Sequence, residues 1–242
     1  MFLRYQIDGP DGADVVVLSN AVGTTLDAWD PQVQVLVPRF RVVRYEHPAC
    51  NDVEDLALAV IELLDELGVE RAAFCGLSLG GAVGLWLGGN APERIGRLVV
   101  ACTSPRYGPG LADRAREARE EGMEVAAEHV LRRWFTPRFE NVGEYREMLV
   151  GVDPKTYAAH CEALSDWDFW DRLEDIEART LVLAGAEDLP LAVEHAKRMA
   201  DRIPRARLLV LGAAAHLASV ERPDGFNRAL LEHLDQAVLD RV

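Results

Sequence analysis

The stretch Gly76-Leu77-Ser78-Leu79-Gly80 combines residue types and a spacing that suit nucleophilic chemistry. An apolar run precedes it and a helix-like apolar run follows it, so Ser78 is predicted to lie on a sharp turn between a strand and a helix. The two glycines leave the room that such a strained turn requires. The turn would expose the Ser78 hydroxyl and direct the Leu79 amide and the positive end of the helix toward a forming oxyanion. This geometry favours acyl transfer.

A carboxylate must follow such a serine in the chain, and the sequence supplies one after a buried-strand pattern at 180–185. That strand ends at Glu187 and Asp188, which are both candidates for the acid. Some hydrolases carry the acid after the strand that follows the nucleophile helix. Here that strand ends in Thr-Ser-Pro at 103–105, without a carboxylate, which leaves the later position.

His216 is the favoured general base, because it follows a strand pattern at 206–211 and comes after the acid. Five other histidines are given structural roles. His47 lies in a loop before Pro48. The remaining four lie in helical patterns and are expected on solvated faces: His129, His160, His195 and His233.

The composition excludes several classes of function. The chain has 242 residues, with 26 Lys and Arg against 40 Asp and Glu, so its net charge is −14. This charge argues against nucleic acid and anionic membranes as partners. No run approaches the roughly 20 apolar residues of a membrane span, and no signal-peptide core is evident, so a cytoplasmic location is expected. The four cysteines lack metal-ligand spacing, and we expect neither a metal nor a cofactor.

Strand and helix patterns alternate along most of the chain, which predicts an α/β fold with a mostly parallel sheet and helices on both faces. The alternation lapses at 105–176, where only helical patterns occur. We expect a helical cap there, inserted between the sixth and seventh strands, with the core formed by 1–104 and 177–242. Such a cap would lie over the carboxyl ends of the strands, where ligands bind in such sheets.

Two further segments are predicted to border the site. The loop 18–24 follows an early strand, and its Val22 amide is the candidate second oxyanion donor beside Leu79. Asn20 in this loop could brace the loop or contact substrate. In the cap, Arg133 and Trp134 place a cation beside an aromatic wall and could hold a small carboxylate.

These segments resemble the α/β-hydrolase family, and more narrowly the 3-oxoadipate enol-lactonases of aromatic catabolism. The likeness runs over most of the chain. It comprises Ser-Asn-x-x-Gly-Thr at 19–24, Trp-Asp-Pro-Gln at 29–32, Phe-Cys-Gly-Leu-Ser-Leu-Gly-Gly at 74–81, Ala-Pro-Glu-Arg-Ile at 91–95, Arg-Trp-Phe-Thr-Pro at 133–137, Ala-Ala-His-Leu at 214–217 and Glu-Arg-Pro at 221–223.

The resemblance implies an α/β-hydrolase fold and hydrolysis of 3-oxoadipate enol-lactone to 3-oxoadipate, without a cofactor. Ser78 would be the nucleophile and His216 the base. The family spacing places the acid three residues after the strand-ending glycine, which favours Asp188 over Glu187. The substrate would be a small lactone or ester that carries a carboxylate.

The sequence departs from the family pattern at two places that border the site. The family usually has an Asp-x-Arg-Gly-His-Gly loop and a Pro-rich stretch after the strand that ends here at Tyr45, whereas 46–52 runs almost directly into a helix. The segment after Asp188 is also a few residues short. Other readings therefore stay open: a carboxylesterase, a C–C bond hydrolase, or a ligand-binding homologue without catalysis. The sequence does not indicate an oligomeric state.

Overall fold

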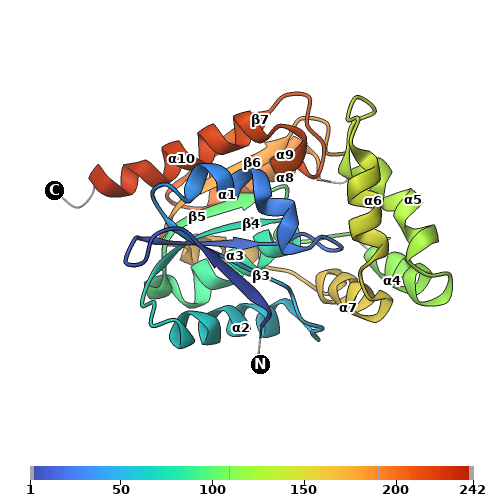
Figure 1. Ribbon diagram of the computed structural model, residues 1–242, viewed down its shortest axis with the longest axis horizontal. Coiled ribbons are helices and arrows are strands. Elements are labelled where there is room, and N and C mark those ends of the chain that lie inside the picture. Colours follow the sequence, from blue (N-terminus) through green and yellow to red (C-terminus); the bar gives the residue numbers. More distant parts are fainter. Residues whose placement is uncertain (1–2, 109, 190, 240–242) are drawn as a thin grey trace.

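The computed structural model describes residues 3–108, 110–189 and 191–239, with side chains described as far as Asp235. Its centre is a twisted sheet of seven strands in the order β1-β3-β2-β4-β5-β6-β7 (Figure 1). Only β1 is antiparallel to its neighbour. The strands are β1 Tyr5–Asp8, β2 Val15–Ser19, β3 Arg41–Tyr45, β4 Ala72–Leu77, β5 Ile95–Ala101, β6 Arg179–Gly185 and β7 Ala206–Leu211.

Helices cover both faces of the sheet. The helices α1 and α10 contact each other on one face, and α2, α3 and α8 lie on the other (Figure 1). The core helices are α1 Asp30–Leu36, α2 Val53–Glu66, α3 Leu79–Asn90, α8 Val193–Arg202, α9 Ala218–Glu221 and α10 Pro223–Leu239, with short 3-10 helices at Leu26–Trp29, Pro92–Arg94 and Trp170–Asp175. Since β2, β4, β5 and β6 are buried on both faces, their sequences are almost wholly apolar.

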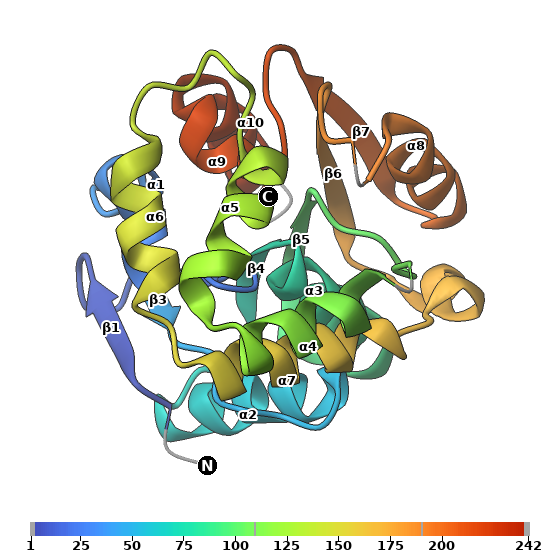
Figure 2. The same ribbon diagram turned by 90° about the vertical axis from the view of Figure 1, so that its right-hand side faces the viewer.

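Four helices between β5 and β6 form a separate group beside the sheet (Figure 1). They are α4 Gly110–Glu120, α5 Met123–Trp134, α6 Val142–Val150 and α7 Pro154–Ser165. Figure 2 looks onto this group and shows it in front of the strands. Its side chains pack against the core: Trp134, Tyr157 and Leu149 are all buried. These helices thus cover the edge of the sheet at which Ser78, Asp188 and His216 lie.

The predicted fold class is confirmed, and two expectations about detail are corrected. The helical insertion follows the fifth strand rather than the sixth, because only five strands precede it. His160 and His233 are buried rather than solvated, whereas His129 and His195 are exposed. The boundaries of the cap as a domain, 105–176, stay a prediction.

The two buried histidines find hydrogen-bond partners in backbone carbonyl groups. The His160 Nε2 lies 2.8 Å from the Pro48 carbonyl, and the His233 Nε2 lies 3.2 Å from the Arg179 carbonyl. A neutral imidazole has one N–H, which can donate to such a carbonyl and so lower the cost of burying the ring. Helical spacing predicts that a residue lies in a helix, but it does not predict whether that residue is buried. Here burial depends on a carbonyl partner from a distant loop or strand.

Candidate active site

Ser78 lies at the turn between β4 and α3 in a backbone conformation that side chains rarely adopt. Its φ and ψ are 55° and −112°, and its amide donates to the Ala101 carbonyl at 2.9 Å. The flanking glycines are required by space: a Cβ on Gly76 would lie 2.0 Å from the Gly80 carbonyl oxygen, and one on Gly80 would lie 2.2 Å from that of Ser19. Such strain persists only where the surroundings hold it, and it is often found at functional sites.

The loops after β6 and β7 bring an acid and a histidine to Ser78. The His216 Nε2 lies 2.9 Å from the Ser78 Oγ, and the His216 Nδ1 lies 2.9 Å from the Asp188 Oδ2. An ionised carboxylate can only accept, so the Nδ1 donates to it and the Nε2 of the neutral ring is left as the acceptor for the serine hydroxyl. The Asp188 side chain is only 1% exposed. This tautomer can remove the proton from Ser78.

Glu187, the other candidate acid, points elsewhere. Its side chain is 42% exposed and forms an ion pair with Arg138. The two neighbouring carboxylates therefore have different surroundings, and the structure brings Asp188 to His216.

Two backbone amides border Ser78, one from the loop between β2 and the first 3-10 helix and one from the start of α3. Val22 lines the same cavity as Ser78 and His216, and within the described residues its amide donates to no protein group. Leu79 is the first residue of α3, so its amide has no acceptor inside the helix. The Gly80 amide donates to the Asn20 carbonyl at 2.9 Å, which ties the loop to α3.

Asn20 braces this loop. It is 1% exposed, and its Nδ2 donates to the Tyr45 carbonyl at 3.0 Å. Among the described residues that line the cavity, Asn20 is missing. Of its two predicted roles, these contacts support the bracing role, and substrate contact stays a prediction.

His47, which belongs to the short segment 46–52, is buried and contacts the loop after β2. Its Nε2 lies 3.1 Å from the Asn20 carbonyl and 3.3 Å from the Ser19 Oγ, which is itself 2.7 Å from the Tyr45 hydroxyl. Its ring packs edge-on against His160 of α7, with 5.8 Å between centroids. Burial, followed by the nearby His160, lowers the pKa of His47 to about 3. The imidazole is therefore neutral and links the loop that carries Val22 to the cap.

We expect this buried histidine to make stability depend on pH. Between pH 6.5 and 3 the unfolded chain binds a proton that folded His47 does not, so each unit of acidification in that window removes about 1.4 kcal/mol of unfolding free energy. His47→Gln should flatten the wild-type slope by about that amount. Urea unfolding at pH 7, 6 and 5 measures it. The exposed His195→Gln is the control, and a His47→Gln slope equal to wild type would contradict the assignment.

A cavity of about 460 Å³ opens at Ser78 and His216, between the sheet and the cap. This volume is in the range of small-molecule sites. Three arginines of the cap line it, namely Arg114, Arg132 and Arg133, and Trp134 and several aliphatic side chains form the apolar part. The one acid in the described lining is Glu187, which is paired with Arg138. The cavity is therefore cationic in a chain whose net charge is −14.

Comparison with known proteins assigns the chain to a family. Residues 16–229 match the model of the alpha/beta hydrolase family. The chain belongs to that family. It is 34% identical to 3-oxoadipate enol-lactonase 2 of Acinetobacter baylyi, with 94% of this chain and 91% of that protein covered. It is 29% identical to the putative carbamate hydrolase RutD of Caulobacter segnis, with 96% of each covered.

The solved structures most similar in fold include two hydrolases. The crystal structure of the enol-lactonase from Burkholderia xenovorans has a TM-score of 0.93 and 35% identity, and 96% of each chain is covered. A hydrolase from Pseudomonas aeruginosa has a TM-score of 0.92 and 40% identity over 96% of this chain and 94% of that one. These relatives and the fold show that the protein is an enzyme that hydrolyses an ester or a lactone.

Two residues near Ser78, Thr103 and Tyr107, were not predicted from the sequence to belong to the site. The Tyr107 hydroxyl is 2.8 Å from the Thr103 Oγ1, which donates to the Ser78 carbonyl at 2.7 Å. Thr103 has a single hydroxyl hydrogen, so Tyr107 must donate to it. Burial raises the pKa of Tyr107 to about 12, which keeps the phenol protonated. Both residues follow β5 directly, and the position after a strand end was the only available signal.

Glu221 joins the cap to the loop of His216. One carboxylate oxygen accepts from the Thr136 amide at 2.9 Å and from the Thr136 hydroxyl at 2.5 Å, and the other accepts from the Ala215 amide at 2.7 Å. A backbone bond from the Leu217 amide to the Trp134 carbonyl at 3.0 Å runs beside it. The carboxylate therefore positions the residue just before His216.

Glu221→Ala is expected to lower kcat about 10- to 100-fold with little change in KM, because a small displacement of His216 misaligns proton transfer. Initial rates on an ester substrate, together with the melting temperature, measure the effect. Glu232→Ala, at an exposed position of α10, is the matched control. A variant that melts earlier but keeps the wild-type kcat would show that Glu221 only stabilises the fold.

In the part of the chain that the structure describes, no three His, Cys, Asp or Glu side chains form a cluster suited to a metal ion. None of the described helices is long and apolar enough to cross a membrane.

Proposed function

We propose that this hydrolase opens 3-oxoadipate enol-lactone to 3-oxoadipate, with Ser78, His216 and Asp188 as the catalytic residues. The observation that carries the proposal is the series of hydrogen bonds from Asp188 through His216 to Ser78. Ser78 and His216 line a cavity that three arginines also line. The hydroxyl and histidine suit acyl transfer, and the arginines suit a substrate that carries a carboxylate. The relatives named enol-lactonases support the same substrate.

In the proposed mechanism His216 takes the Ser78 proton while the Ser78 Oγ bonds to the lactone carbonyl carbon. The Val22 and Leu79 amides stabilise the oxyanion of the tetrahedral intermediate. The ring C–O bond then breaks, and His216 gives its proton to the departing oxygen. The enol formed in this way tautomerises to a ketone. His216 then takes a proton from water as the water oxygen bonds to the acyl carbon, and it returns this proton to the Ser78 Oγ when the bond between that oxygen and the acyl carbon breaks. This step releases the second carboxylate and free Ser78. No cofactor takes part in these steps.

The carboxylate of the substrate is assigned to the cap arginines. Arg133 is exposed and lies next to Trp134 in the cavity lining. Arg114 is half-buried and donates to the Tyr157 hydroxyl, so part of its donor set is already used. Arg133 can therefore turn its whole guanidinium fork toward a carboxylate.

Arg133→Met is expected to raise KM for the enol-lactone about 10-fold or more and to leave KM for a neutral phenyl ester within about twofold, since only the former presents a charge to the arginine. Arg116→Met, on the exposed surface of α4, is the control. Parallel initial-rate measurements on both substrates decide the matter. Equal changes for the two substrates would remove Arg133 from this role.

The substrate assignment is tested by comparing kcat/KM for three compounds: the enol-lactone, a neutral phenyl ester and a simple carbamate. The proposal predicts the highest value for the enol-lactone. The carbamate is included because relatives named putative carbamate hydrolases match nearly the whole chain. A carbamate or neutral ester that reacts faster through Ser78 would overturn the substrate while keeping the hydrolase. No reaction of Ser78 with a fluorophosphonate would favour a ligand-binding homologue.

The proposal extends to the setting of the enzyme. Its partner is a small lactone or ester with a carboxylate, and the acidic surface suits neither nucleic acid nor anionic membranes. We propose a cytoplasmic location.

A further inference from the structure

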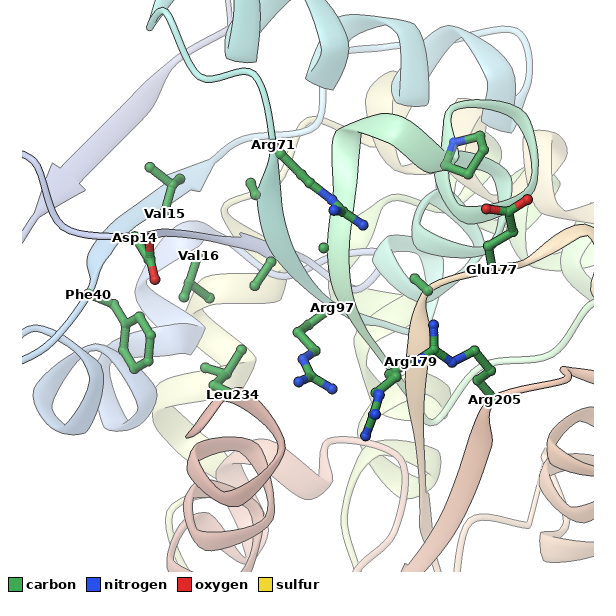
Figure 3. Close-up of a pocket in the computed structure, with 15 residues that line it drawn as sticks. Asp14, Val15, Val16, Phe40, Arg71, Arg97, Glu177, Arg179, Arg205 and Leu234 are labelled. Carbon is green, nitrogen blue, oxygen red and sulfur yellow. The ribbon is translucent and has the colours of Figure 1, made fainter. Parts of the chain in front are cut away.

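The edge of the sheet opposite the catalytic residues holds a second cavity. It has a volume of about 510 Å³ and lies at the amino ends of the parallel strands (Figure 3). Among the described residues, none lines both this cavity and the one at Ser78. A ligand bound here would not touch the substrate.

Arginines at the starts of four neighbouring strands line this cavity. Arg71 precedes β4, Arg97 lies in β5, Arg179 begins β6 and Arg205 precedes β7. Figure 3 shows these four side chains around one space, with Val15, Val16, Phe40 and Leu234 on its opposite side. The acids in the described lining are Asp14 and Glu177, so four positive charges face two negative ones in a chain whose net charge is −14.

The strand register brings two of these positive charges together. Arg97 and Arg179 are direct neighbours across the β5–β6 pair. The positive field extends to His233, whose pKa is lowered to about 4 by burial and then by Arg97 and Arg207.

The two outer arginines keep donors for a ligand. Arg71 and Arg205 are both exposed, and Arg71 donates to the Ile95 carbonyl at 3.2 Å. Within the described residues, neither forms an ion pair. The guanidinium fork matches carboxylate and phosphate groups in a bidentate manner.

We propose that this cavity binds a small anion that carries two or more carboxylate or phosphate groups. The groups would be held by Arg71 and Arg205 at the rim. The apolar wall of Val15, Val16, Phe40 and Leu234 leaves room for a short carbon skeleton. Because the site lies away from Ser78, its ligand stabilises the folded enzyme by linkage without competing with substrate.

The test is calorimetric titration of the full chain with pyrophosphate and with citrate, at fixed ionic strength because exposed charges are screened by salt. We expect saturable binding of one anion per chain. Arg71→Gln and Arg205→Gln should each weaken it about 10-fold or more, since each removes a charge-assisted hydrogen bond. Arg116→Gln, which removes an equal charge from α4, should bind as wild type does.

The rate of Ser78 labelling by a fluorophosphonate, measured with and without the anion, reports on the other site. The proposal predicts labelling at the wild-type rate in both arginine variants. The ratio of the two affinities distinguishes a phosphate site from a carboxylate site. The absence of saturable binding for both probes, or an equal loss in Arg116→Gln, would overturn the proposal.

Discussion

Ser78→Ala is expected to lower kcat on an ester or lactone substrate about 10⁶-fold, because the group that forms the acyl-enzyme is removed. The residual rate should still exceed that of water by about 10³- to 10⁴-fold, since substrate binding and the two amides proposed to bind the oxyanion remain. Initial rates with excess enzyme measure it.

The fold should survive this change. Alanine keeps the strained backbone of Ser78, whose φ is 55°, and removes only an oxygen that bonds to His216. The melting temperature of Ser78→Ala should therefore stay near that of wild type. Ser165→Ala, at the end of α7, is the matched control and should retain full activity. A Ser78→Ala enzyme with more than a tenth of the wild-type kcat would exclude Ser78 as the nucleophile.

Asp188→Asn should lower kcat about 10⁴-fold. The amide keeps the shape of the side chain, but it can present an N–H to the His216 Nδ1. The ring would then carry its proton on the Nε2, facing Ser78, and could not accept the hydroxyl proton. The effect should fall on kcat far more than on KM, because Asp188 does not line the cavity among its described residues.

The adjacent acid provides the control for this experiment. Glu187→Gln removes the same charge one residue earlier, where the side chain pairs with Arg138 near the cavity mouth. We expect it to keep kcat within about threefold of wild type, as surface ion pairs contribute little. If Glu187→Gln lost activity and Asp188→Asn kept it, the acid would have been assigned to the wrong carboxylate.

The sequence was sufficient to predict the strand–helix alternation and the loop positions of Ser78, Asp188 and His216. Strands β4 and β6 appear in the sequence as apolar runs and β7 as a shorter one, and the proposed catalytic side chains lie in the turns and loops that follow these three strands. Their convergence follows from topology, because the carboxyl ends of parallel strands meet at one edge of a sheet.

Contacts between distant segments could not be predicted in this way. The carboxylate of Glu221 lies 85 residues from its partner Thr136 in sequence, and nothing in either segment indicates the other. The same holds for His160, which is buried because a loop carbonyl at Pro48 faces it. The arginines of the second cavity lie at the starts of separate strands and become neighbours only through strand order.

The most direct test of the account is the mass of the intermediate. Rapid-quench mass spectrometry of the enzyme mixed with excess 3-oxoadipate enol-lactone should show an adduct that adds the whole mass of the lactone, since ring opening releases no separate leaving group. Peptide mapping should place the adduct on Ser78, and prior fluorophosphonate labelling of Ser78 should abolish both adduct and turnover. Turnover that continues after Ser78 has been blocked, or an adduct on another residue, would contradict the account.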